Sequence, residues 1–182
     1  TLKSVQDWVS NGGRLILVSG ALNAFADKNG FALKKYATEE AKKEAEKKDK
    51  EEQTKDVLMP YDAAERKAIS QSISGAIYKI TLDKTHPLAF GLGDTYYTLK
   101  TNELYFDYLQ GGWNVGVIKR KAKPVQGFAG HKINKKMDNS FVFGVEDKGR
   151  GQIVYFVDDP LFRNFWENGK MLFANAVFMV GQ

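Results

Sequence analysis

The sequence lacks several residue types on which much protein chemistry depends. It has no cysteine and only two histidines, His86 and His131, among 182 residues. The absence of cysteine excludes disulfide bonds, thiolate metal ligands and a cysteine nucleophile. Two histidines nearly exclude a zinc site built from histidines within the chain. Long apolar runs are also missing: the apolar stretch near the C-terminus spans residues 172–180, whereas a membrane-spanning helix needs about 20 residues.

What the sequence does contain is enough apolar material for a core. Hydrophobic residues make up 43% of the chain, and 12 Phe, 8 Tyr and 3 Trp supply much of the bulk. Disorder of the whole chain is therefore excluded. The length suits one domain, which we expect to span residues 1–182. Because the chain starts at Thr1 without a signal-peptide pattern, we expect it to be a fragment of a longer protein.

The first thirty residues have the rhythm of an α/β fold. Residues 2–10 have the apolar spacing of an amphipathic helix, which Asn11-Gly12-Gly13 ends. Residues 14–18 form an uninterrupted apolar run, typical of a parallel strand covered on both faces. A turn at Ser19-Gly20 then leads into a short helix over 21–26. This order predicts a doubly wound α/β sheet.

A charged insertion interrupts this pattern over residues 38–56. Its only apolar residues are Ala41 and Ala45, and Glu-to-Lys pairs recur at the four-residue spacing that supports helices. Without an apolar stripe the insertion cannot dock firmly on a core. We expect an exposed helical or disordered segment.

The remainder of the chain is rich in strand patterns. The candidate strands cover residues 75–82, 96–99, 104–109, 113–118, 125–128, 140–145 and 152–157. In the first of them Tyr78, Ile80 and Leu82 share one face. Residues 146–151 are typical of a hairpin loop. Asp158-Asp159-Pro160 predicts the start of a helix, whose core-facing side would contain Phe162, Phe165, Trp166, Leu172, Phe173 and Val177.

Three local patterns favour structural roles over functional ones. His86 precedes Pro87 and is expected to cap or pack at a turn, and His131 is expected at the surface. Gly149-Arg150-Gly151 precedes a strand, so it fits a hairpin turn better than a phosphate loop. Residues 119–136 hold seven lysines and arginines and no acid. This stretch favours a solvent-facing basic loop or an acidic partner, and nucleic acid is the less favoured partner because no recognition motif accompanies it.

The ends of two buried strands are where an open α/β sheet would place a site. These ends are Ser19-Gly20 and Asp158-Asp159. Ser19 lacks the G-x-S-x-G context of a nucleophile elbow, and no histidine follows the second strand. We therefore expect a vestigial pocket at Ser19, Gly20, Asp158 and Asp159, without catalytic or metal-binding residues.

Four segments together resemble the class I glutamine amidotransferase-like fold. They are residues 12–18, 86–91, 149–163 and 170–176. More narrowly, they resemble the accessory domain that follows the catalytic domain in secreted bacterial zinc carboxypeptidases of the M14 type. The resemblance implies a three-layer α/β fold with a mostly parallel, flavodoxin-like sheet that lacks its N-terminal strands and carries extra antiparallel ones. A sheet edge left exposed in this way would favour a homodimer.

The resemblance also implies that this chain is not an enzyme. Active amidotransferases carry a cysteine where this chain has Ser19-Gly20, and His-Pro-Glu where it has Asp159-Pro160-Leu161. The zinc-binding His-x-x-Glu of the carboxypeptidases is replaced by His86-Pro-Leu-Ala89. Zinc is then expected in an upstream peptidase domain, the partner that this domain would brace, and the location would be periplasmic or secreted. The alternative is a stand-alone module that binds a sugar or another small polar ligand.

Overall fold

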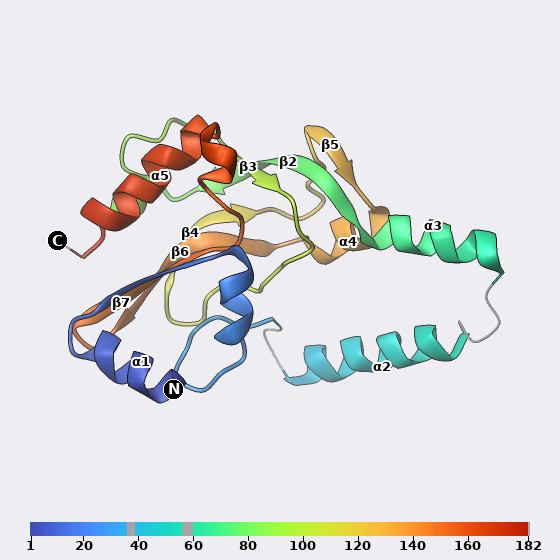
Figure 1. Ribbon diagram of the computed structural model, residues 1–182, viewed down its shortest axis with the longest axis horizontal. Helices are drawn as coiled ribbons and strands as arrows, with labels where there is room; N and C mark the ends of the chain where they lie inside the picture. Colours follow the sequence, from blue (N-terminus) through green and yellow to red (C-terminus); the bar gives the residue numbers. More distant parts are fainter. Residues whose placement is uncertain (36–38, 56–59, 182) are drawn as a thin grey trace.

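The computed structural model describes residues 1–35, 39–55 and 60–181 (Figure 1). The α-helices are α1 (Leu2–Ser10), α2 (Glu39–Lys55), α3 (Tyr61–Gln71), α4 (His131–Lys136) and α5 (Glu167–Phe178). Short 3-10 helices are η1 (Ser19–Ala24), η2 (Pro87–Ala89) and η3 (Phe162–Asn164). The strands are β1 (Arg14–Val18), β2 (Ile73–Leu82), β3 (Tyr96–Lys100), β4 (Trp113–Ile118), β5 (Gln126–Ala129), β6 (Ser140–Lys148) and β7 (Gly151–Phe156).

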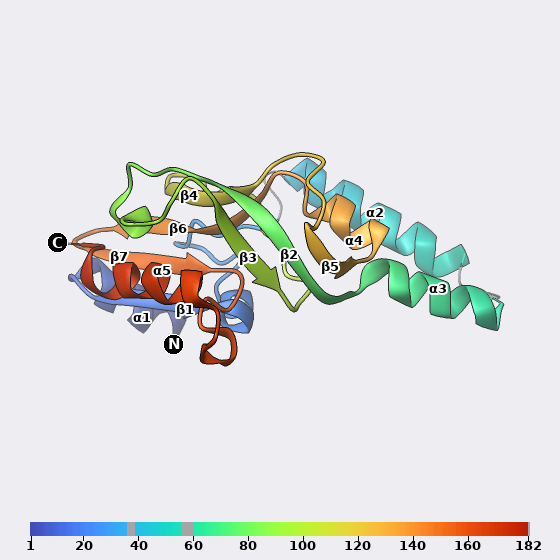
Figure 2. The ribbon, with the colours of Figure 1, turned by 90° about the horizontal axis from the view of Figure 1, so that it is seen from above.

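The sheet is curled and mostly antiparallel, which corrects the predicted fold class. Its strand order is β1-β7-β6-β4-β2-β3, and β5 pairs with β2. Only β1 and β7 are parallel, while every other pair of these strands is antiparallel. The long β2 pairs with β4 near its end and with β3 and β5 along the rest of its length, so the sheet bends into a half-barrel (Figure 2). The predicted three-layer, mostly parallel, flavodoxin-like sheet is therefore wrong.

The error has a physical origin in the apolar runs that form β1 and β7. An uninterrupted apolar run predicts a strand that is buried on both faces and has parallel neighbours. β7 is indeed buried on both faces, but it is parallel to β1 on one side and forms an antiparallel hairpin with β6 on the other. Burial on both faces therefore shows that a strand is covered on both sides, but it does not determine whether its neighbours are parallel or antiparallel.

Two apolar clusters cover the two faces of the sheet. On one face, α5 packs its Leu172 and Ala176 against strand residues such as Val154 and Phe156. On the other face, Val9 of α1, Leu22 of η1 and the loop residues Phe31 and Leu33 pack against alternate strand residues, among them Ile153 and Tyr155. The alternation along β7 follows directly from the two-residue period of a strand.

A buried carboxylate holds the covering loop in place on the second face. Glu146 of β6 is 7% exposed, and its Oε2 atom accepts hydrogen bonds from the Ala32 backbone N–H at 2.8 Å and from the Tyr155 hydroxyl at 2.6 Å. Buried polar groups are stable when they are paired in this way. Burial raises the pKa of the Tyr155 hydroxyl, and the neighbouring Glu146 raises it further.

Several local predictions are confirmed. The helix over 2–10 and the strand over 14–18 have the predicted bounds, and Tyr78 and Ile80 lie buried on one face of β2. His86 caps η2, because its Nδ1 atom accepts the Leu88 N–H at 3.0 Å. The charged insertion expected over 38–56 contains α2, none of whose described side chains is buried, while residues 38 and 56 lie outside the described residues.

Other local predictions are wrong. Residues 104–109 contribute an isolated bridge at Phe106 instead of a strand. Pro160 does not begin a long helix, since η3 intervenes and α5 begins at Glu167. Phe165 and Val177, predicted to face the core, are 57% and 40% exposed.

The segment from Pro160 to α5 bends back on itself before the helix begins. Arg163 and Asn164 adopt left-handed backbone conformations, with φ of 48° and 57°. This bend redirects the chain before α5 packs on the sheet (Figure 2). No helix in the described part of the chain is long and apolar enough to span a membrane.

Candidate functional site

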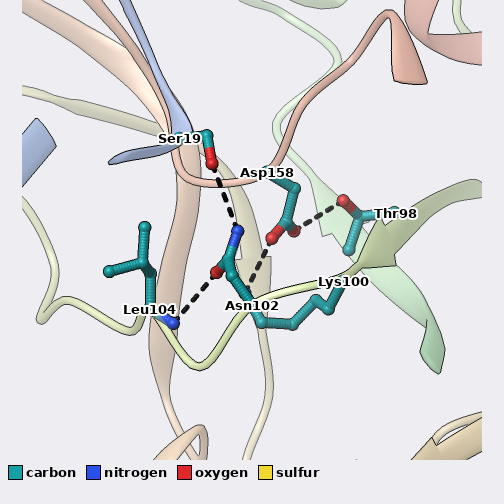
Figure 3. Close-up of polar contacts among 6 residues, drawn as sticks. All are labelled: Ser19, Thr98, Lys100, Asn102, Leu104 and Asp158. Atoms are coloured by element: carbon teal, nitrogen blue, oxygen red, sulfur yellow. Dashed lines mark hydrogen bonds and ion pairs between the residues drawn. The ribbon is translucent and has the colours of Figure 1, made fainter. Parts of the chain in front are cut away.

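The carboxyl ends of β1 and β7 lie side by side, as the predicted vestigial pocket required. The two strands are parallel and in register from Arg14 opposite Gln152 to Val18 opposite Phe156. Ser19 follows β1 directly, and Asp158 comes two residues after β7 ends. Figure 3 shows both side chains at this end, with residues from β3 and the loop after it.

Asp158 is a buried carboxylate in a closed network. Its Oδ1 atom lies 2.8 Å from Nζ of Lys100, and its Oδ2 atom accepts a hydrogen bond from the Thr98 hydroxyl at 2.7 Å (Figure 3). The side chains of Lys100 and Asp158 are 2% and 4% exposed. Both carboxylate oxygens therefore have a partner, which a charge at this depth requires.

The charge of Asp158 affects the tyrosines around it. Burial raises the pKa of the Tyr78 hydroxyl to about 12, and the negative charge of Asp158 adds to the increase. Tyr96 on β3 is affected in the same way, and the pKa of its hydroxyl is also raised, chiefly by burial. Both phenols stay neutral at physiological pH, so neither supplies a base to the site.

Ser19 occupies a sharp turn beside this network. Its backbone is left-handed, with φ of 51°, which is uncommon for a residue with a side chain. Its Oγ atom accepts a hydrogen bond from Nδ2 of Asn102 at 3.2 Å, and Oδ1 of Asn102 accepts the Leu104 N–H at 2.9 Å (Figure 3). The amide of Asn102 thus ties the turn after β1 to the loop after β3.

The geometry at this end of the sheet favours a structural role. The cavity beside Asp158 has a volume of only about 10 Å³, which is the space of about one water molecule. Among the described residues Ser19 has the amide of Asn102 as its hydrogen-bond partner and no hydrogen bond to a base, while the Lys100 ammonium group is paired with Asp158. A nucleophile needs an adjacent base and room for a substrate.

The other two predicted site residues lie at the rim. Gly20 is exposed in η1, where no side chain or backbone lies within 4 Å of the place a Cβ would take. Asp159 is partly buried, and its Oδ1 atom accepts the Leu161 N–H at 2.9 Å. The four residues do gather at one end of the sheet, and the cavity that Asp158 and Asp159 line there has a volume of only about 10 Å³.

The two histidines lie apart from this end of the sheet. The ring of His86 packs against Trp113, with 5.9 Å between ring centroids, and His131 lies in a surface groove. Within the described residues no three His, Asp or Glu side chains come together as metal ligands would.

Open cavities occur elsewhere on the molecule. One, here called the basic groove, has a volume of about 700 Å³ and lies between α3, β5 and the start of α4. A second, the arginine pocket, has a volume of about 270 Å³ beside the β6–β7 turn. A third, of about 330 Å³, separates α2 from the loop that carries Tyr105 and from Lys136.

Three partners in the network around Asp158 and Ser19 escaped the sequence analysis, namely Thr98, Lys100 and Asn102. A signal for two of them was present. In β3 the strand period places Tyr96, Thr98 and Lys100 on the same side, so a core-facing tyrosine implies an inward lysine. An inward lysine needs a carboxylate partner, but the sequence alone does not indicate which one.

Comparison of the chain with protein-family models, with curated proteins and with solved structures gave no match in any of the three.

Proposed function

We propose that this chain is a non-catalytic accessory domain that packs against another domain of a larger protein through the outer face of α5. The sequence resemblance would make that neighbour a zinc carboxypeptidase domain of the M14 type, which holds the zinc and acts in the periplasm or outside the cell. The observation that carries the proposal is the apolar character of a helix face that remains exposed.

Beyond its first turn, which carries Glu167, Asn168 and Lys170, the outer face of α5 lacks the polar residues of a solvated helix. From Met171 to Gly181 the chain has no charged residue. Met171 is 48% exposed, Val177 is 40% exposed, and Phe178 is 68% exposed. A stretch of helix whose outer face is also apolar is normally covered on that face.

A loop extends the same patch. The Asn175 side chain of α5 donates hydrogen bonds to the carbonyl oxygens of Leu88 at 3.0 Å and Phe90 at 2.7 Å. This places the Phe90 loop beside α5, and the Phe90 side chain is 63% exposed. Contiguous apolar surface of this kind marks protein–protein contacts more often than isolated exposed residues do.

Among the described residues, the absence of a ligand-sized cavity beside Asp158, at the ends of β1 and β7, is a second support for a non-catalytic role. In this proposal the Lys100–Asp158 pair fills the carboxyl ends of the two parallel strands, the position at which open α/β sheets place their sites. The domain would contribute surface and rigidity, and the chemistry would belong to its neighbour.

The test compares the isolated chain with its full-length parent for zinc content and for release of C-terminal amino acids from peptides. We expect both properties in the parent and neither in the chain. Met171→Lys should leave unfolding of the isolated chain nearly unchanged but make the parent more sensitive to proteolysis between its domains. Asn168→Lys on the same helix is the matched control because Asn168 is exposed and polar.

A parent without zinc and without peptidase activity would contradict the link to carboxypeptidases. Equal sensitivity of the Met171→Lys and Asn168→Lys parents to proteolysis would contradict the docking role of α5.

The arginine pocket favours a second candidate function, the binding of a small polar ligand. Arg14 and Arg150 line it with Asp147 and Gln152, and neither arginine forms an ion pair with a described carboxylate. The Oε1 atom of Gln152 is buried and has no hydrogen-bond partner among the described residues. A ligand with an anionic group and a hydroxyl, such as an acidic sugar, would satisfy the arginines and this acceptor.

Glucuronate, with glucose as the uncharged comparison, tests this candidate by isothermal titration. Binding of glucuronate that Arg150→Gln abolishes would favour the ligand-binding module. Equal, weak heats of binding for glucuronate and glucose would contradict the ligand-binding function.

A further inference from the structure

The basic groove combines cationic side chains with an apolar floor. Arg66 and Ile69 reach it from α3, Lys123 from the loop before β5, Phe128 from β5 and His131 from α4. Ile69 is 48% exposed and Phe128 is 46% exposed. No acidic side chain lines the groove among the described residues.

The surroundings strengthen this charge. The groove borders the segment 119–136, which holds seven lysines and arginines and no acid. Neither Arg66 nor Lys123 forms an ion pair with a described carboxylate, and both are exposed. Their charges are therefore available to a partner, and a cluster of one sign attracts the opposite sign over about 10 Å at moderate salt.

The shape of the groove is fixed by contacts within the chain. The Gly130 N–H donates to the Ser72 carbonyl at 2.9 Å, and the Gly130 backbone approaches Ser70 so closely that a Cβ would meet the Ser70 carbonyl. The turn between β5 and α4 is thereby held against the end of α3. A preformed groove loses less conformational entropy on binding than a flexible surface does.

A second set of contacts holds the opposite wall. The Tyr78 hydroxyl donates to Oδ1 of Asn134 at 2.7 Å, and Nδ2 of Asn134 donates to the Ala122 carbonyl at 3.2 Å. Asn134 thus joins α4 to the loop that carries Lys123 and to the core of β2. The cationic and apolar groups of the groove are fixed relative to one another.

We propose that the basic groove binds an acidic peptide segment of a partner protein, with one apolar side chain of that segment on Phe128 and Ile69. Carboxylates flanking the apolar residue would pair with Arg66 and Lys123. The charge of the lining and its apolar floor together specify this occupant, since either feature alone would suit many partners.

Single-stranded nucleic acid fits the groove less well. Such ligands stack successive bases on several aromatic side chains along a basic track. Apart from the imidazole of His131, Phe128 is the only aromatic side chain among the described residues that line the groove. The aliphatic groups of Ile69, Pro124 and Ala129 suit an apolar side chain better than a series of bases.

This groove is separate from the surface of the proposed accessory function. Figures 1 and 2 place α3, β5 and α4 at the end of the molecule opposite α5. The chain could therefore contact a neighbouring domain through α5 and an acidic segment through the groove at the same time. Failure of one proposal leaves the other standing.

The test measures binding of a fluorescent peptide, a short run of Glu and Asp with one central Leu, by anisotropy at low and physiological salt. We expect Arg66→Gln combined with Lys123→Gln to weaken binding about tenfold or more, roughly the loss of two weak ion pairs. Phe128→Gln should weaken it as well, and replacing the central Leu of the peptide by Gln should have the same effect.

The matched control removes two exposed charges far from the groove, by Lys3→Gln combined with Lys28→Gln. This control should bind the peptide like the unchanged chain, and circular dichroism should show that every variant is folded. An equal loss in the control would mean general charge attraction and would overturn the proposal. Tighter binding of a single-stranded oligonucleotide of the same charge, or no peptide binding at low salt, would overturn it too.

Discussion

At the scale of single residues, Lys100 and Asp158 form a buried ion pair, with side chains 2% and 4% exposed. It joins β3 to the end of β7, across 58 residues of sequence. The pair takes two charges out of water, so its net contribution is smaller than its geometry suggests. Removing only one partner is strongly destabilising, because the remaining charge is then buried without a countercharge.

The first prediction concerns this pair. Asp158→Asn should lower the free energy of unfolding by about 3–5 kcal/mol, since it leaves the Lys100 ammonium group buried without a countercharge. Replacing both residues by apolar ones of similar size should recover much of the loss. Urea denaturation measures both effects. Glu167→Gln, which breaks the exposed pair with Lys170, serves as the control and should change stability by less than about 1 kcal/mol.

A second prediction at this scale concerns His86. Partial burial lowers the pKa of its imidazole below the ordinary value of 6.5, and the charges of Asp83 and Asp147 only partly oppose this effect. Protonation at Nδ1 would also remove the acceptor for the Leu88 N–H. The unfolded chain therefore binds a proton more readily than the folded one, and stability should fall as the pH drops from about 6.5 through the lowered pKa.

The test of this pH dependence is a series of unfolding curves between neutral and mildly acidic pH. His86→Asn keeps a capping acceptor but cannot titrate, so its stability should vary less over the same range. The pKa of Asp83 is lowered by hydrogen bonds from Thr85, and that carboxylate titrates at still lower pH, below its ordinary value. An unchanged slope in His86→Asn would show that another group is responsible.

At the scale of elements, α5 is held close to the end of β7 by a glycine. A Cβ at Gly169 would lie 2.6 Å from the carbonyl carbon of Pro160 and would overlap its oxygen. Glycine in the middle of a helix is usually unfavourable by about 1 kcal/mol relative to alanine. Here the close approach of two backbones reverses that preference.

The third prediction follows from this contact. Gly169→Ala should destabilise the fold by about 1–3 kcal/mol, although alanine favours the helix, because α5 must move away from Pro160. Asn168→Ala, one residue earlier and exposed, should be neutral or slightly stabilising. Thermal unfolding of the two variants gives the comparison. If Gly169→Ala unfolded at a higher temperature than the unchanged chain, the backbone at Pro160 would have moved without loss of packing, and the prediction would be wrong.

Most elements could be predicted from the sequence, but their pairing could not. Alternation over 75–82 and the apolar runs at 14–18 and 152–157 indicated strands, and the structure contains them. Residues 104–109 have the same strand-like composition, yet only Phe106 forms a bridge. A strand-like composition indicates only that a segment suits an extended, half-buried conformation. Whether it forms a strand depends on whether another strand lies beside it to accept and donate backbone hydrogen bonds.

At the scale of the whole molecule, the sheet has open edges at β1 and at β3. Among the described strands β1 pairs only with β7, and β3 pairs only with β2. Unpaired strand edges present free backbone groups that can pair with another chain. The homodimer expected from the sequence would use such an edge.

The fourth prediction is that the isolated chain dimerises through the edge of β1. Sedimentation velocity over a range of concentrations measures this association. Met171→Lys should leave the dimer intact, because backbone pairing at β1 does not involve α5. A monomer at every concentration would remove the prediction, and loss of the dimer in Met171→Lys would assign association to the α5 face instead.

The sequence alone determined what this chain cannot carry and where its local elements begin. The missing cysteines and scarce histidines limit its chemistry, and side-chain periodicity depends only on neighbouring residues. The tertiary structure alone decided that β7 has one parallel and one antiparallel neighbour, and that Lys100 meets Asp158. These contacts join residues far apart in sequence, so they depend on the path of the whole chain and on which surfaces it buries together.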